Sequence, residues 1–267
     1  MTPSRRIRAA LGAVWLAWGA HLVLSGAPAW LATRSLWALL GHRPAGAGAL
    51  WEPGAGVALD TGRRWVEESG GGSALYPLLG ATVAALLLSP WLTMTWLTAL
   101  HRPGRTLREA TLGGLRRYPH AVAVSLCVGA VGALAAAAAS LVPVGAHLLL
   151  KAHPDVALHD LSVLAACLPA LLVLLAWGAW HDQARAALLV TAHPLRAAIA
   201  GLRTLRPLRV VTFSGYSLLG VALAAVTLRL SVTPASGAEG LVVVVVLGQL
   251  SVLARLIVRA HWLARLV

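Results

Sequence analysis

The sequence predicts an all-α, polytopic membrane protein with six transmembrane helices and both termini in the cytoplasm. Of its 267 residues, 58% are hydrophobic and only 12% are charged, about half the charged fraction of a soluble domain. The charge is also asymmetric, because sixteen of the 22 Lys and Arg residues fall on one side of the predicted membrane. That side has a net charge of +14 and the other a net charge of −1. An excess of Lys and Arg marks cytoplasmic loops.

Six long apolar stretches define the predicted transmembrane helices. Each is close to the roughly 20 residues that cross about 30 Å of hydrocarbon as a helix. Helices are expected because every backbone group must be hydrogen-bonded within the protein in lipid. The stretches are 9–30, 75–99, 120–150, 160–181, 209–228 and 240–262. We therefore treat residues 1–267 as a single membrane domain.

The first stretch resembles a secretory signal, since Arg5, Arg6 and Arg8 precede its apolar run. Five more apolar stretches follow, so we expect this one to be retained as a transmembrane helix. Residues 34–72 form the one long segment between stretches. They are rich in Gly and include Trp37, Trp51 and Trp65. Because Trp favours the head-group level, this segment is predicted to lie along the periplasmic interface.

Two basic segments on the cytoplasmic side resemble each other. Residues 106–119 read TLREATLGGLRRYP, and residues 194–207 read PLRAAIAGLRTLRP. Each lies between a helix that enters and a helix that leaves the cytoplasmic side. The pattern favours a parallel internal repeat, with units at about 75–150 and 160–228. Chance similarity between segments rich in Leu, Arg and Ala is the alternative.

Both basic segments are predicted to be interfacial helices that contact lipid. The second has an apolar stripe at helical spacing, made of Leu195, Ala198, Ile199, Leu202 and Leu205. Arg196 and Arg203 flank this stripe, and Arg108 and Arg116 lie in the first segment. Their guanidinium groups are suited to lipid phosphate while their stems cover apolar surface. An alternative with equal support is that both segments are ordinary positively charged cytoplasmic loops that happen to be helical.

Asp182 is an acid at the cytoplasmic end of the fourth predicted helix, and Arg185 follows it at i+3. This spacing favours an ion pair on one helix face. We expect the pair to lie at the interface and to have no chemical role.

Three prolines interrupt the predicted transmembrane helices away from their ends: Pro90, Pro143 and Pro169. Proline breaks at membrane depth expose backbone groups to a substrate or an ion in transporters. Proline is also tolerated in ordinary membrane helices. The prolines therefore support an alternative function, a permease or small-molecule exporter with a cavity between the two repeats.

No catalytic residue, metal ligand or cofactor site is predicted. The sequence has no Gly-rich phosphate loop, HExxH or GxSxG pattern. A polar cluster near the outer ends of the third and fourth helices matches no recognised metal-site pattern. It consists of His147, Lys151, His153, Asp155, His159 and Asp160. The positive charge is confined to one membrane side, so we expect anionic lipids as partners, and not nucleic acid.

One region resembles a known family. It comprises WHDQARAALLVTAHPLRAAIAGLRTLRP (180–207), with support from LLLSPWLTMTWLTAL (86–100). These segments are similar to the glycerophosphoryl diester phosphodiesterase membrane domain of bacterial six-helix proteins, over about 75–260. The residues that match its turn are Asp182, Ala184, Arg185, Leu189 and Val190. Members take their name from an attached soluble hydrolase that these residues do not include. The resemblance therefore implies a topology and not an activity.

The predicted function follows from these points. A basic content of 21 Arg and one Lys, with abundant Ala, Leu and Gly, indicates a GC-rich bacterial source and hence a bacterial inner membrane. We expect a non-catalytic scaffold or accessory subunit that contacts anionic lipid or a protein partner in the membrane.

Overall fold

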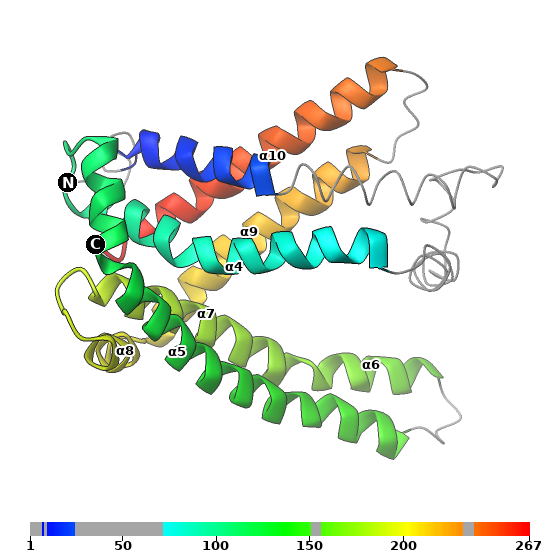
Figure 1. Cartoon of the computed structure of the whole chain (residues 1–267). Coiled ribbons are helices and arrows are strands. Elements are labelled where there is room, and N and C mark those ends of the chain that lie inside the picture. The colour runs from blue at the N-terminus through cyan, green and yellow to red at the C-terminus, as the bar shows by residue number, and fades with distance from the viewer. Residues whose placement is uncertain (1–6, 8–9, 25–71, 151–155, 232–237) are drawn as a thin grey trace. The chain divides into compact units, whose positions relative to one another are not determined.

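A computed structural model describes residues 7, 10–24, 72–150, 156–231 and 238–267. Its secondary structure within these ranges is helical, as Figure 1 shows. The labelled helices are α4 (Gly72–His101), α5 (Leu107–Leu150), α6 (Val156–Ala166), α7 (Leu168–Ala187), α8 (Pro194–Arg203), α9 (Pro207–Ser231) and α10 (Ala238–Ala264). A further helix covers Leu11–Leu24. Most of the predicted periplasmic segment 34–72, and Arg5, Arg6 and Arg8, lie outside the described residues.

Within the described residues, five helical stretches are long and apolar enough to cross a membrane, which indicates a multi-pass membrane protein. They are Leu79–His101, Leu107–Leu150, Leu161–Ala187, Pro207–Thr227 and Val246–Ala264. They coincide with the second to sixth predicted stretches. The first, 9–30, corresponds to the shorter apolar helix Leu11–Leu24, and its remainder lies largely outside the described residues. The all-helical class is therefore confirmed, while six transmembrane helices and their orientation stay predictions.

The contact pattern divides the chain into two compact units. Unit 1 contains Met1–Ala10, Pro90–Leu218 and Arg259–Val267, and unit 2 contains Leu11–Ser89 and Leu219–Val258. Helices α4, α9 and α10 each contribute to both units. The unit boundaries at Ser89 and Leu218 fall inside the two predicted repeats, so the units are not the repeats. The arginine-rich segments belong to unit 1, and the site is built from this unit alone.

Within unit 1, α5 packs against α6, α7 and α8, and α7 packs against α8. The buried core gathers at the ends of the helices that adjoin the basic segments. It includes Met94, Leu97, Val124 and Trp262. Farther along α5 many apolar side chains are exposed, and Leu149 is 86% exposed. Such exposure is unfavourable in water, and it is expected of side chains that face lipid.

The first basic segment is continuous with the transmembrane helix that follows it. Helix α5 starts at Leu107 and runs through Pro119 and Pro143. Figure 1 shows its axis changing direction near its start. The expected separate interfacial helix is thus the first part of α5, because Pro119 bends the helix and does not end it. Helix α4 likewise continues through Pro90, whereas Pro169 adjoins a break at Cys167 between α6 and α7.

Candidate functional site

A tight turn joins α4 to α5 and brings two arginines together. It reads Arg102-Pro103-Gly104-Arg105, and the Arg105 N–H donates to the Arg102 carbonyl over 3.4 Å. Gly104 has φ +100°, a conformation that glycine adopts without the Cβ clash of other residues. Proline followed by such a glycine is typical of a type II turn, whose end residues lie within about 7 Å of each other. The turn therefore places Arg102 and Arg105 side by side.

Helix α5 starts with a capping box that occupies the one acid of this region. The Glu109 carboxylate accepts a hydrogen bond from the Thr106 N–H at 2.9 Å. In return, the Glu109 N–H donates to the Thr106 hydroxyl at 3.3 Å. This reciprocal arrangement satisfies two donors that a helix start leaves without partners. The carboxylate is thus held at the helix start, and the described residues give it no ion pair with a neighbouring arginine.

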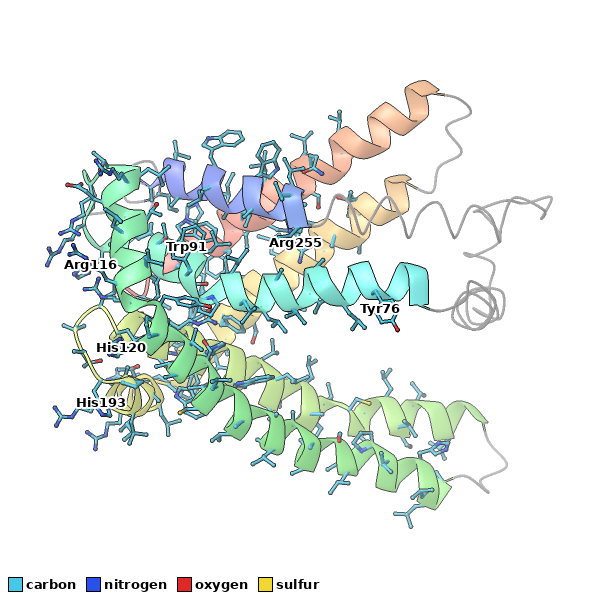
Figure 2. All side chains as sticks on the ribbon, in the orientation of Figure 1. Tyr76, Trp91, Arg116, His120, His193 and Arg255 are labelled. Atoms are coloured by element: carbon cyan, nitrogen blue, oxygen red, sulfur yellow. The ribbon has the colours of Figure 1, made fainter. Side chains whose placement is uncertain are left out.

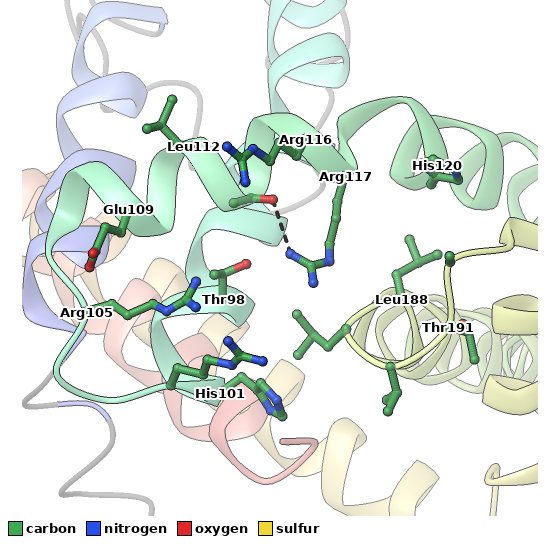
Figure 3. Close-up of a pocket in the computed structure, with 15 residues that line it drawn as sticks. Thr98, His101, Arg105, Glu109, Leu112, Arg116, Arg117, His120, Leu188 and Thr191 are labelled. Atoms are coloured by element: carbon green, nitrogen blue, oxygen red, sulfur yellow. Dashed lines mark hydrogen bonds between the residues drawn. The ribbon is translucent and has the colours of Figure 1, made fainter.

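The turn, the first part of α5 and residues 188–192 after α7 surround a cavity of about 660 Å³. We call it the arginine cavity, since Arg102, Arg105, Arg116 and Arg117 line it with Glu109. In Figure 3 the side chains of Arg105 and Arg117 extend towards each other across it. Arg117 also donates a long 3.5 Å bond to the Gly113 carbonyl, drawn as a dashed line in Figure 3. The cavity is a concave, strongly basic surface of unit 1.

Helix α8 packs its small residues inward and presents its large and charged residues outward. Proline begins it, after His193 in extended conformation, as the residue before proline prefers. Ala197, Ala198 and Gly201 are buried. Leu195 and Leu202 of the predicted stripe are 56% and 50% exposed, and Arg196 and Arg203 are also exposed. The predicted stripe needs two corrections, since Ala198 faces the protein and Leu205 lies beyond the helix end.

Glycines let the basic segments approach the preceding helices closely. A Cβ added at Gly201 would lie 2.6 Å from the Ala184 backbone nitrogen of α7. A Cβ added at Gly114 of α5 would lie 2.7 Å from the Thr95 backbone nitrogen of α4. Real Cβ atoms do not approach backbone so closely. Both glycines belong to the Gly-Leu-Arg triplets that the two basic segments share.

Asp182 is buried at the end of α7 and pairs with the end of α10. It is 1% exposed. One of its carboxylate oxygens accepts from Arg259 at 2.5 Å, and the other accepts from the Trp262 indole N–H at 2.7 Å. Phe213 of α9 packs edge-on against Trp262, with ring centroids 5.4 Å apart. The ion pair of Asp182 thus joins α7 to α10, and not to Arg185 as expected.

Arg185 and Gln183 are also buried, and they make different contacts. The Arg185 guanidinium donates to the Ser125 hydroxyl of α5 at 3.0 Å and to the Thr93 hydroxyl of α4 at 3.4 Å. The Gln183 side-chain oxygen accepts from Thr204 at 2.8 Å and from Arg209 at 3.1 Å. We call Asp182, Gln183 and Arg185 the α7 polar cluster. Its contacts connect the end of α7 with α4, α5, α9, α10 and the residues after α8.

The predicted site residues fall into three groups. Arg116 lines the arginine cavity, Arg108, Arg196 and Arg203 are exposed, and Asp182 and Arg185 are buried in the α7 polar cluster. In Figure 2, the labelled Arg116, His120 and His193 lie at one end of α5 and α8, where nitrogen-bearing side chains gather. Sequence reasoning missed the cavity, although Pro103-Gly104 marks a turn between arginines. It also missed Arg259 and Trp262, for which no local signal exists.

The described residues contain no group of three or more His, Cys, Asp or Glu side chains placed to hold a metal ion. The cluster predicted near the outer ends of the third and fourth helices falls mostly on side chains outside the described set. No protein-family model, curated protein or solved structure matches the chain. The resemblance to the glycerophosphoryl diester phosphodiesterase membrane domain therefore stays a prediction.

Proposed function

We propose that this chain is a non-catalytic integral protein of a bacterial inner membrane, whose arginine-rich face lies in the cytoplasm and binds anionic lipid. It acts there as a scaffold or accessory subunit that also contacts a protein partner. The excess of Lys and Arg on one side of the apolar stretches supports this orientation.

The observation that carries the proposal is the orientation of α8. Its buried small residues fix it against α7, while Leu195, Ile199 and Leu202 are exposed beside Arg196 and Arg203. Exposed leucines next to arginines form the surface of a helix that lies in a membrane interface. Apolar side chains enter the acyl boundary there, and guanidinium groups meet phosphate. A helix of ten residues reaches about 15 Å along that interface.

The repeat and the family resemblance belong to the same proposal. Gly114 and Gly201 occupy corresponding positions in the two basic segments and approach the preceding helix in the same way. This correspondence supports a duplicated unit of entering helix, basic segment and leaving helix. The resemblance rests on the same region, since Asp182 and Arg185 lie in its matching turn.

Substitution of Arg108, Arg116, Arg196 and Arg203 by Gln tests the proposal. Each basic residue near an anionic surface contributes about 1 kcal/mol to membrane attraction. The fourfold variant should therefore retain much less phosphatidylglycerol through purification, as measured by mass spectrometry of bound lipid. A fourfold Lys variant keeps the charge and serves as the control. Unchanged lipid retention in the Gln variant would remove the lipid-contact proposal.

The scaffold role is tested separately, by mild extraction of the full chain and mass spectrometry of co-purifying proteins. A stoichiometric partner is expected. A lone protein carrying one enriched small molecule would favour the alternative of a permease or exporter. One observation favours the permease or exporter alternative: the arginine cavity is lined by segments of both proposed repeats. Flux of the enriched molecule through proteoliposomes would decide it.

A further inference from the structure

We propose that the arginine cavity is a discrete binding site for a phosphate group, carried by a lipid head group or by a soluble phosphate compound. This inference rests on the proposed function and deepens it, because it identifies one saturable site on a face that otherwise attracts lipid diffusely.

The first argument is uncompensated charge. Four arginines line the cavity against one glutamate, and the Glu109 carboxylate is held by the Thr106 N–H. Within the described residues, the guanidinium groups of Arg102, Arg105 and Arg116 have no ion pair or hydrogen bond. Like charges gathered around one concave surface repel each other, so an anion at their centre is favoured.

The second argument is the type of donor. A guanidinium group offers a planar fork of N–H donors that matches two phosphate oxygens. Arg105 and Arg117 approach the cavity from different segments, the turn and α5 respectively (Figure 3). The hydroxyl groups in the lining already donate elsewhere, Thr98 to the Met94 carbonyl and Thr191 to the Ala187 carbonyl. Apart from the imidazoles of His101 and His120, which also line the cavity, the arginines are therefore the side-chain donors that face a ligand, and their charge selects an oxyanion.

The third argument is size and construction. A volume of about 660 Å³ falls within the roughly 300–1,000 Å³ of small-molecule sites. A bare phosphate ion would leave much of it unfilled, so the phosphate is attached to a further group. The walls are also fixed locally, on one side by the Gly104 turn and the capping box of α5. On the other, the Thr191 N–H bonds the Ala187 carbonyl at 2.9 Å and closes the end of α7.

The test uses the full chain, purified in a neutral detergent, with the double variant R105Q/R117Q. Its matched control is R206Q/R265Q, which removes the same charge from exposed positions that lie outside the cavity and are not among the four proposed lipid-contact arginines. One arm titrates inorganic phosphate and glycerol 3-phosphate by calorimetry. The other counts phosphatidylglycerol bound per protein, from nanodiscs of phosphatidylglycerol and phosphatidylcholine, by native mass spectrometry. Thermal unfolding of both variants checks that the fold is retained.

The cavity variant should lose affinity by about 100-fold, since each guanidinium contributes charged hydrogen bonds, while the control changes little. Binding in the calorimetric arm identifies a soluble phosphate compound, and one retained lipid per protein identifies a head group. No saturable binding in either arm, or equal losses in both variants, would overturn the proposal. Arg116 lines the cavity, so the two proposals are separated by a variant in which only Arg108, Arg196 and Arg203 are replaced by Gln. If this variant retains its lipid while R105Q/R117Q loses saturable binding, the lipid-contact proposal fails and the discrete site stands.

Discussion

The two basic segments of unit 1 start from similar sequences and take different structures. The first, at 107–119, is the start of α5 and continues through Pro119 into the transmembrane part of that helix. The second, α8, ends at Arg203, and a new helix begins at Pro207. Both pack on the preceding helix through a glycine. The glycine contact therefore does not explain why one segment is continuous with the next helix and the other is not.

The preceding helix explains the difference. Gly201 faces Ala184, and the neighbouring Gln183 accepts hydrogen bonds from Thr204 and Arg209 on either side of the break. Gly114 faces Thr95, and the residue corresponding to Gln183 is Met94, whose thioether is a poor acceptor. Polar contacts with Gln183 thus stabilise the interruption after α8, and Met94 offers the first segment no comparable acceptor. Two similar sequences do not ensure the same helix boundaries when the helices on which they pack differ.

The largest expected effect comes from the glycine that both regions share. Gly201→Ala and Gly114→Ala each push a methyl group against backbone, so each should destabilise the protein by about 1–3 kcal/mol. Thermal unfolding in detergent measures this. Gly215→Ala is the control, because nothing lies within 4 Å of its added Cβ. Equal melting temperatures for Gly201→Ala and Gly215→Ala would show that the close approach is not required.

Exchanging Gln183 and Met94, the corresponding residues of the two preceding helices, tests the cause of the interruption between α8 and α9. Gln183→Met removes the acceptor of Thr204 and Arg209, which should cost about 1–2 kcal/mol. Hydrogen exchange of the amides at 204–206 should change as well, since the contacts that stabilise this interruption are lost. Met94→Gln is the reciprocal variant, and it buries an amide among apolar side chains. If exchange at 204–206 stays unchanged in Gln183→Met, the break has another origin.

The smallest effect on stability is expected at the exposed leucines. Leu202→Ser and Leu115→Ser alter side chains that are about half exposed, so the free energy of unfolding in detergent should change by less than about 0.5 kcal/mol. Accessibility of nearby sites to water-soluble labels in a bilayer should rise for Leu202→Ser. A large loss of stability in detergent would mean that Leu202 packs on protein and not on lipid.

Several elements could be predicted from sequence because their causes are local. Apolar length predicted the five long helices, and the helical spacing of Leu195, Ile199 and Leu202 predicted α8. The convergence of Arg102 and Arg105 on a cavity could not be predicted, because it depends on the turn at Gly104 and on residues 188–192. The partner of Asp182 could not be predicted, because Arg259 lies 77 residues away. The spacing of three residues between Asp182 and Arg185 favoured a local ion pair. In the structure Asp182 pairs instead with Arg259 of α10.

The same separation has a consequence for biosynthesis. Ribosomes deliver α7 to the membrane well before α10, so the Asp182 carboxylate is inserted without its ion-pair partner. A charge in that position is unfavourable until Arg259 and Trp262 arrive to pair with it. We expect assembly intermediates that lack the end of α10 to expose α7 to membrane proteases. A helix that is synthesised later thus determines whether the earlier helices are retained.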